Sequence, residues 1–79
     1  MAKDGNIVHQ YFKKQFGGTT ILVRVNPIRF TGTELTLAPD GKAELRELQF
    51  DEGIFDDLKH DGFEEASPLE FNLYISGLA

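Results

Sequence analysis

The chain has 79 residues, of which 41% are hydrophobic and 27% charged, and its formal net charge is −5 at pH 7. This composition is typical of a folded protein, and a chain of this length leaves little room for a deep internal cavity. The absence of cysteine excludes disulfides, thiolate nucleophiles and thiolate metal sites. We therefore expect residues 1–79 to form a single small domain, with residues 1–5 as a disordered N-terminus.

Two further features of the whole chain concern its location and its charge. The polar N-terminus is not followed by an apolar run long enough for a signal peptide or a membrane span, so the sequence predicts a cytoplasmic protein that does not contact membranes. Residues 1–30 carry a net charge of +4, and residues 31–79 carry −9. Such polarity can steer a charged partner, and it is equally typical of a surface that needs only solubility.

Residues 5–16 have apolar side chains at spacings that include several i, i+4 pairs, which predicts a helix packed against a sheet. Gly17 or Gly18 would end this helix in the left-handed conformation. Residues 19–25 are rich in β-branched side chains and predict the central strand. Alternation places Val23 on one face of that strand and Leu22 on the other, so we expect an apolar face that includes Val23 and a wet face that includes Leu22.

The next two strands are expected to form a meander. Thr31-Gly32 reads as a tight turn that would bring Ile28 opposite Leu35. The segment Ala38-Pro39-Asp40-Gly41 predicts a second hairpin, because proline suits the second turn position and glycine the left-handed one. That hairpin would pair Leu37 with Ala43 and Leu35 with Leu45 on the buried side, and Thr36 with Glu44 and Glu34 with Arg46 on the exposed side.

The strand is expected to end after Glu47, because Leu48 and Phe50 fall out of the alternation. Residues 51–61 then predict a short helix with Asp51 as its N-cap, ended by Gly62 in the left-handed conformation with Phe63 closing on Leu58. Residues 64–68 read as a linker.

The last element, residues 69–75, alternates between apolar and polar side chains and predicts a strand that buries Leu69, Phe71, Leu73 and Ile75. The expected order is thus α-β-β-β-α-β. We predict an α+β fold in which two short helices pack on one face of a small, mostly antiparallel sheet of about four strands. The alternative is a small, partly open β-barrel with helical additions.

The sequence offers little that suggests catalysis, and we expect neither an enzyme nor a cofactor. On a helix, Asp56 and Asp57 would lie close enough to His60 to ligate a divalent ion, but a histidine and carboxylate pair near a helix C-terminus explains the same residues without metal. A calcium loop beginning at Asp57 fails, because Lys59 and Pro68 occupy ligand positions. The sequence therefore predicts no metal site.

Two hypotheses for function follow from the residues. The first is a non-enzymatic domain that binds a protein partner or a second copy of itself, through the acidic segment 51–65 and an exposed C-terminal strand. The candidate binding residues are Ile54, Phe55, Asp56, Asp57 and Phe63.

The alternative is a domain that binds single-stranded nucleic acid through basic groups near aromatic rings. Its candidate residues are Tyr11, Lys13, Lys14, Arg24 and Arg29. Against it, the net charge repels phosphate, and Phe12 and Phe16 are expected to be needed in a small core.

Overall fold

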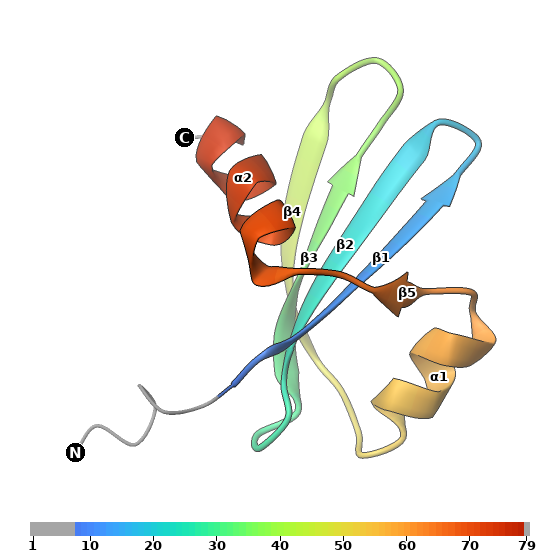
Figure 1. Cartoon of the computed structure of the whole chain (residues 1–79), viewed down its shortest axis with the longest axis vertical. Coiled ribbons are helices and arrows are strands. Elements are labelled where there is room, and N and C mark those ends of the chain that lie inside the picture. Colours follow the sequence, from blue (N-terminus) through green and yellow to red (C-terminus); the bar gives the residue numbers. More distant parts are fainter. Residues whose placement is uncertain (1–7, 79) are drawn as a thin grey trace.

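The computed structural model describes residues 8–78, so the expectation for residues 1–5 lies outside the described residues. Its centre is a five-stranded antiparallel sheet in the order β4-β3-β2-β1-β5 (Figure 1). The strands are β1 (Gln10–Phe16), β2 (Thr19–Asn26), β3 (Thr31–Leu37), β4 (Ala43–Gln49) and β5 (Glu64–Glu65), and the helices are α1 (Ile54–His60) and α2 (Pro68–Leu78). The α+β class is confirmed and the sheet is open, whereas the order of elements is β-β-β-β-α-β-α and there are five strands instead of four.

The first correction concerns residues 10–16, which form a strand and not a helix. β1 pairs with β2 along its whole length, and Phe12 lies opposite Val23, where both are buried. Gly17 and Gly18 both have positive φ, so they form the two-residue turn of this hairpin instead of ending a helix. The long ladder to β2 satisfies the backbone of β1 and decides the structure of a stretch whose local pattern favoured a helix.

β2 is the central strand as predicted, but neither of its faces is wet. Val23 and Val25 pack in one apolar layer with α1, and Leu22 packs in a second layer on the other side of the sheet. Leu22 is fully buried there against Leu35 and Phe71 of α2. The two helices therefore cover opposite faces of the sheet, and the expectation that both lie on one face is wrong.

The turn between β2 and β3 comes earlier than predicted. Thr31 and Gly32 belong to β3, and residues 27–30 make the turn. The Asn26 Oδ1 atom accepts hydrogen bonds from the backbone N–H groups of Ile28 and Arg29 at 2.9 and 3.1 Å. Phe30 takes the left-handed conformation with φ 56°, and its ring packs against the layer of α1. The prediction placed the turn at a glycine, but the Asn26 side chain and the packing of Phe30 fix it elsewhere.

The hairpin of β3 and β4 is confirmed in full register. Its pairs include Leu37 with Ala43, Thr36 with Glu44, Leu35 with Leu45 and Glu34 with Arg46. The strand also continues to Gln49 without a bulge, so its expected end after Glu47 is wrong. Leu48 lies opposite Gly32, on the same face as Arg46. Leu45 remains 49% exposed, because α2 does not cover it as it covers Leu35.

The predicted short helix is present as α1, although it is shorter at its start. Gly53 is the N-cap residue, and Asp51 instead accepts a hydrogen bond from the Gly53 N–H at 2.9 Å. The C-terminal end is as predicted: Gly62 has φ 89°, and the Phe63 N–H donates to the Leu58 carbonyl oxygen at 2.9 Å.

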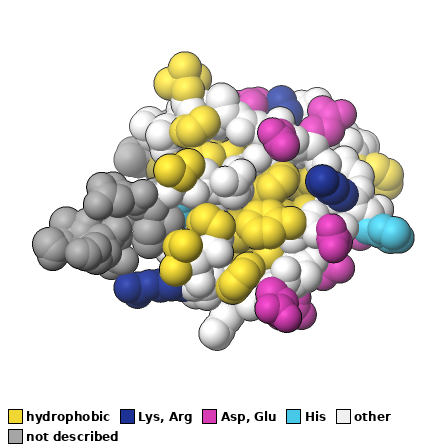
Figure 2. Space-filling view, turned by 60° about the horizontal axis from the view of Figure 1, so that its bottom comes forward, with side chains coloured by type: hydrophobic (Ala, Val, Ile, Leu, Met, Phe, Trp, Pro, Cys, Tyr) yellow, Lys and Arg dark blue, Asp and Glu magenta, His cyan; other side chains and the backbone are white. Residues whose placement is uncertain are grey.

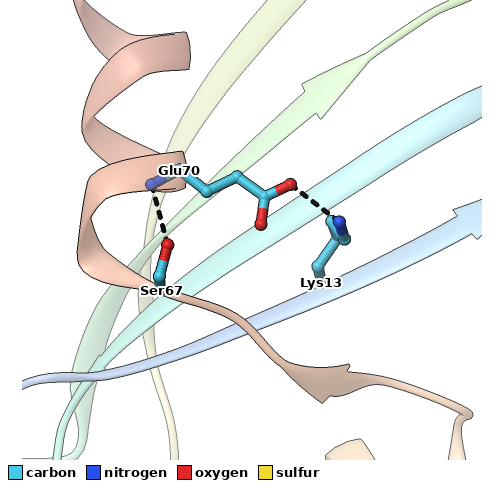
Figure 3. A network of polar contacts seen from close by, with 3 residues as sticks. All are labelled: Lys13, Ser67 and Glu70. Atoms are coloured by element: carbon cyan, nitrogen blue, oxygen red, sulfur yellow. Dashed lines mark hydrogen bonds and ion pairs between the residues drawn. The ribbon is translucent and has the colours of Figure 1, made fainter.

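The C-terminal element is a helix and not the predicted strand. Phe71 and Ile75 lie four residues apart on the side of α2 that packs on the sheet, whereas Leu69 and Leu73 point the other way and are 67% and 64% exposed. The start of α2 is fixed by Ser67, whose Oγ atom accepts a hydrogen bond from the Glu70 N–H at 3.1 Å (Figure 3). The predicted linker also contains β5, which pairs with β1.

Figure 3 also shows how α2 is tied to the sheet. The Nζ atom of Lys13, on β1, donates a hydrogen bond to the Glu70 carboxylate at 2.7 Å. This bond raises the pKa of Lys13 above its ordinary value of 10.5. No helix within residues 8–78 is long and apolar enough to cross a membrane.

Candidate protein-interaction surface

The strongest candidate site lies around α1, at the end of the molecule opposite the turn between β3 and β4 (Figure 1). α1 has seven residues, and Ile54 and Leu58, four residues apart, are buried against β1 and β2. This anchoring turns Asp56 and Asp57 to the solvent. Phe55 lies between these two environments and is half-buried.

A shallow groove of about 290 Å³ separates α1 from the neighbouring strands. Its apolar part consists of Phe12, Pro27 and Phe55, and the rings of Phe12 and Phe55 lie 5.9 Å apart. The rest of its lining consists of Gln10, Lys59 and Glu65. The groove thus combines an apolar floor with charged side chains on its border, which is typical of a surface that holds one apolar side chain of a partner.

Carboxylates are concentrated in the segment that brings Phe55, Lys59 and Glu65 to this groove. We call residues 51–65 the acidic lobe, because it carries seven exposed carboxylates and a single lysine, a net charge of −6 with His60 neutral. The seven are Asp51, Glu52, Asp56, Asp57, Asp61, Glu64 and Glu65. Figure 2 looks onto this end of the molecule and shows hydrophobic side chains gathered in the middle, with acidic side chains along one side of them.

The predicted protein-binding residues fall into three environments. Phe55, Asp56 and Asp57 lie at the surface of α1, with Phe55 in the groove. Ile54 is buried in the core and is not available to a partner. Phe63 is half-buried, with the Lys14 Nζ atom 5.8 Å from its ring centroid.

Sequence reasoning missed the residues that other segments bring to the groove. Gln10 and Phe12 come from β1, Pro27 comes from the turn after β2, and Glu65 comes from β5. No local pattern marks them, because they meet only through the pairing of β1 with β2 and with β5.

The residues of the nucleic-acid alternative are not gathered on one surface. Lys13 and Arg24 lie on the face covered by α2, where Lys13 binds Glu70 and the Arg24 guanidinium lies 5.3 Å from the Phe71 ring centroid. Tyr11 makes an edge contact with the same ring at 5.5 Å. Lys14 points to the opposite face, as alternation along β1 requires, and Arg29 lies in the turn of residues 27–30. Phe12 is buried as expected, but Phe16 is exposed and adds nothing to the core.

The described residues contain no group of three or more histidine, aspartate or glutamate side chains placed to hold a metal ion. His60 is the last residue of α1 and is exposed.

Comparisons of the chain with protein-family models, with curated proteins and with solved structures find no match. The chemistry of the acidic lobe and its groove is therefore the basis for a proposed function.

Proposed function

We propose that this chain is a small, non-enzymatic protein-interaction domain that binds a basic segment of a partner protein in the groove beside α1. The observation that carries the proposal is the acidic lobe, with its seven exposed carboxylates, which supplies Phe55 and Glu65 to a groove whose apolar floor is Phe12, Pro27 and Phe55. A partner with arginine or lysine on both sides of one large apolar side chain fits both parts of this surface.

The two parts have different physical roles. Exposed ion pairs contribute only about 0.2–1 kcal/mol each, so the acidic lobe mainly speeds encounter and selects the sign of the partner's charge. The groove supplies the anchor, because a large apolar side chain that leaves water there contributes about 1.5–3 kcal/mol. We expect a weak, salt-sensitive complex, as is typical of small transient interfaces.

The first experiment uses a labelled synthetic peptide that carries arginines on both sides of one tryptophan. Fluorescence anisotropy should show binding that weakens as salt rises, and no binding when glutamate replaces each arginine. A labelled single-stranded oligonucleotide tests the alternative in the same assay. If the oligonucleotide binds and the basic peptide does not, the proposal is wrong and the nucleic-acid alternative gains support.

A pair of matched variants then locates the site. Asp56→Asn with Asp57→Asn removes two charges from α1, and we expect peptide binding to weaken about fivefold, on the basis of about 0.5 kcal/mol for each exposed pair. Asp40→Asn with Glu44→Gln removes the same charge at the distant hairpin and should change binding much less. Equal weakening in both double variants would mean that net charge alone attracts the peptide.

A further inference from the structure

The edge of the sheet formed by β4, on the side away from β1 and β5, takes no part in the proposed groove. β4 is an edge strand of seven residues that pairs without interruption with β3 and contains neither proline nor a bulge. Such an edge presents free backbone donors and acceptors, and natural proteins usually protect it. The central side chain of its apolar face, Leu45, is 49% exposed.

Hydrogen bonds at the two ends of the hairpin show which residues of β4 face outward. The Ala38 N–H donates to the Lys42 carbonyl oxygen at 2.8 Å, and the Phe50 N–H donates to the Phe30 carbonyl oxygen at 2.6 Å. Bonded pairs alternate along an antiparallel ladder, so the even-numbered residues between them bond to β3. The backbone groups of the odd-numbered residues therefore point to the open edge: Ala43, Leu45, Glu47 and Gln49.

We propose that β4 pairs with β4 of a second copy of this chain, antiparallel and centred on Leu45, to join two sheets into one. In this register Leu45 lies opposite Leu45 of the second copy, and Glu44 lies opposite Arg46 twice, once on each side of the symmetry axis. Ala43 lies opposite Glu47. The outward residues 43, 45 and 47 then exchange about six backbone hydrogen bonds.

The charges of β4 favour this register over the others that a two-fold axis allows. An axis at Glu44, Arg46 or Glu47 places that residue directly opposite its own copy, and like charges at that distance are destabilising. Axes nearer either end of the strand pair only a few of its residues. A guanidinium nitrogen of Arg46 already lies 3.6 Å from a carboxylate oxygen of Glu34 in its own chain. In the dimer, Arg46 would therefore lie between two carboxylates, that of Glu34 and that of Glu44 of the second copy.

This inference is independent of the proposed function, because β4 forms one edge of the sheet, whereas β1 and β5, which line the groove, lie at the other edge. The test is sedimentation velocity over a range of protein concentrations. The wild-type chain should form a dimer. Glu44→Arg should raise the dimer dissociation constant about tenfold or more, because two attractive pairs become repulsive. Asp57→Arg makes the same charge change on α1 and should leave dimerisation intact.

A mixing experiment separates the proposed register from general charge effects. Arg46→Glu should also prevent self-association, but an equal mixture of Glu44→Arg and Arg46→Glu chains should dimerise, because each unlike pair is restored between the two variants. Circular dichroism checks that Arg46→Glu folds, since it faces Glu34 in its own chain. If it does not fold, Leu45→Lys, which places two like charges at the axis, replaces it as the second disrupting variant.

Amide hydrogen exchange gives the register directly. At concentrations where the wild-type chain is dimeric, the amides of Ala43, Leu45 and Glu47 should become protected, whereas that of Gln49 should not, because it lies beyond the paired segment. A wild-type chain that stays monomeric, a dimer that Glu44→Arg does not weaken, or protection that includes Gln49 would each overturn the inference.

Discussion

Gly32 is a position in β3 where no side chain fits. A Cβ atom there would overlap the Arg24 carbonyl oxygen and would lie 2.6 Å from Cε2 of the Phe50 ring. The φ of Gly32 is not in the left-handed region, so space alone excludes a side chain. The backbone of β2 and the Phe50 ring approach this residue closely. This close approach explains why a glycine lies inside a strand here, although the sequence pattern indicated a turn.

We therefore expect Gly32→Ala to destabilise the protein by about 1–3 kcal/mol, because a backbone atom of β2 must move to make room. Urea unfolding measures the change. Gly53→Ala is the control, since its added Cβ would meet only the end of the Asp51 side chain at 3.3 Å. A Gly32→Ala protein as stable as the Gly53→Ala protein would contradict the packing described here.

At the scale of elements, the sequence predicted those features that local chemistry fixes. Pro39-Asp40-Gly41 and Gly62 specify a turn and a helix end through a few neighbouring residues, and both were predicted correctly. The helix predicted for residues 10–16 was wrong because Tyr11 and Phe12 face different apolar layers. A strand that is apolar on both faces does not alternate between apolar and polar residues, so the sequence does not show the period of a strand.

The residues at the start of α2 contain a pattern that distinguishes a helix from a strand. Phe71 and Ile75 fit a period of two and a spacing of four equally well, so alternation alone could not separate strand from helix. Ser67 followed by Pro68, with Glu70 three residues after the serine, is a typical helix start and would have favoured the helix. For the candidate site, only the residues on α1 itself could be predicted, because strand pairing brings the others to the groove.

The ion pair that joins α2 to β1 predicts a dependence on pH. The hydrogen bond with Glu70 raises the pKa of Lys13, so its contribution to stability is fully present below the ordinary value of 10.5 and is lost as pH rises through the raised value. A double-mutant cycle of Lys13→Met and Glu70→Gln, followed by urea unfolding, should show a favourable coupling energy at neutral pH that disappears well above pH 10.5. A coupling energy that persists at that alkaline pH would show that the two side chains interact by packing and not by charge.

At the scale of the whole molecule, one sheet supports two separate apolar layers. The layer of α1 contains Val23 and Ile54, and the layer of α2 contains Leu22 and Phe71. β2 contributes to both layers, whereas each helix contributes to one. α2 also stands at the end of the described chain and packs on the sheet mainly through Phe71 and Ile75. We therefore expect each helix to open locally without the other, and the amides of β2 to exchange only on global unfolding.

Native-state hydrogen exchange tests this arrangement with two mild variants. Phe71→Leu loses the ring contacts with Tyr11 and Arg24, so a cost of about 1 kcal/mol should speed exchange in α2 about fivefold and leave α1 unchanged. Ile54→Val should destabilise the other layer by about 0.5–1.5 kcal/mol, which should speed exchange in α1 and leave α2 unchanged. Both variants should lower the protection of β2, because both layers share that strand. If either variant speeds exchange in both helices equally, the two layers open as one unit, and the two faces of the sheet are energetically coupled through β2.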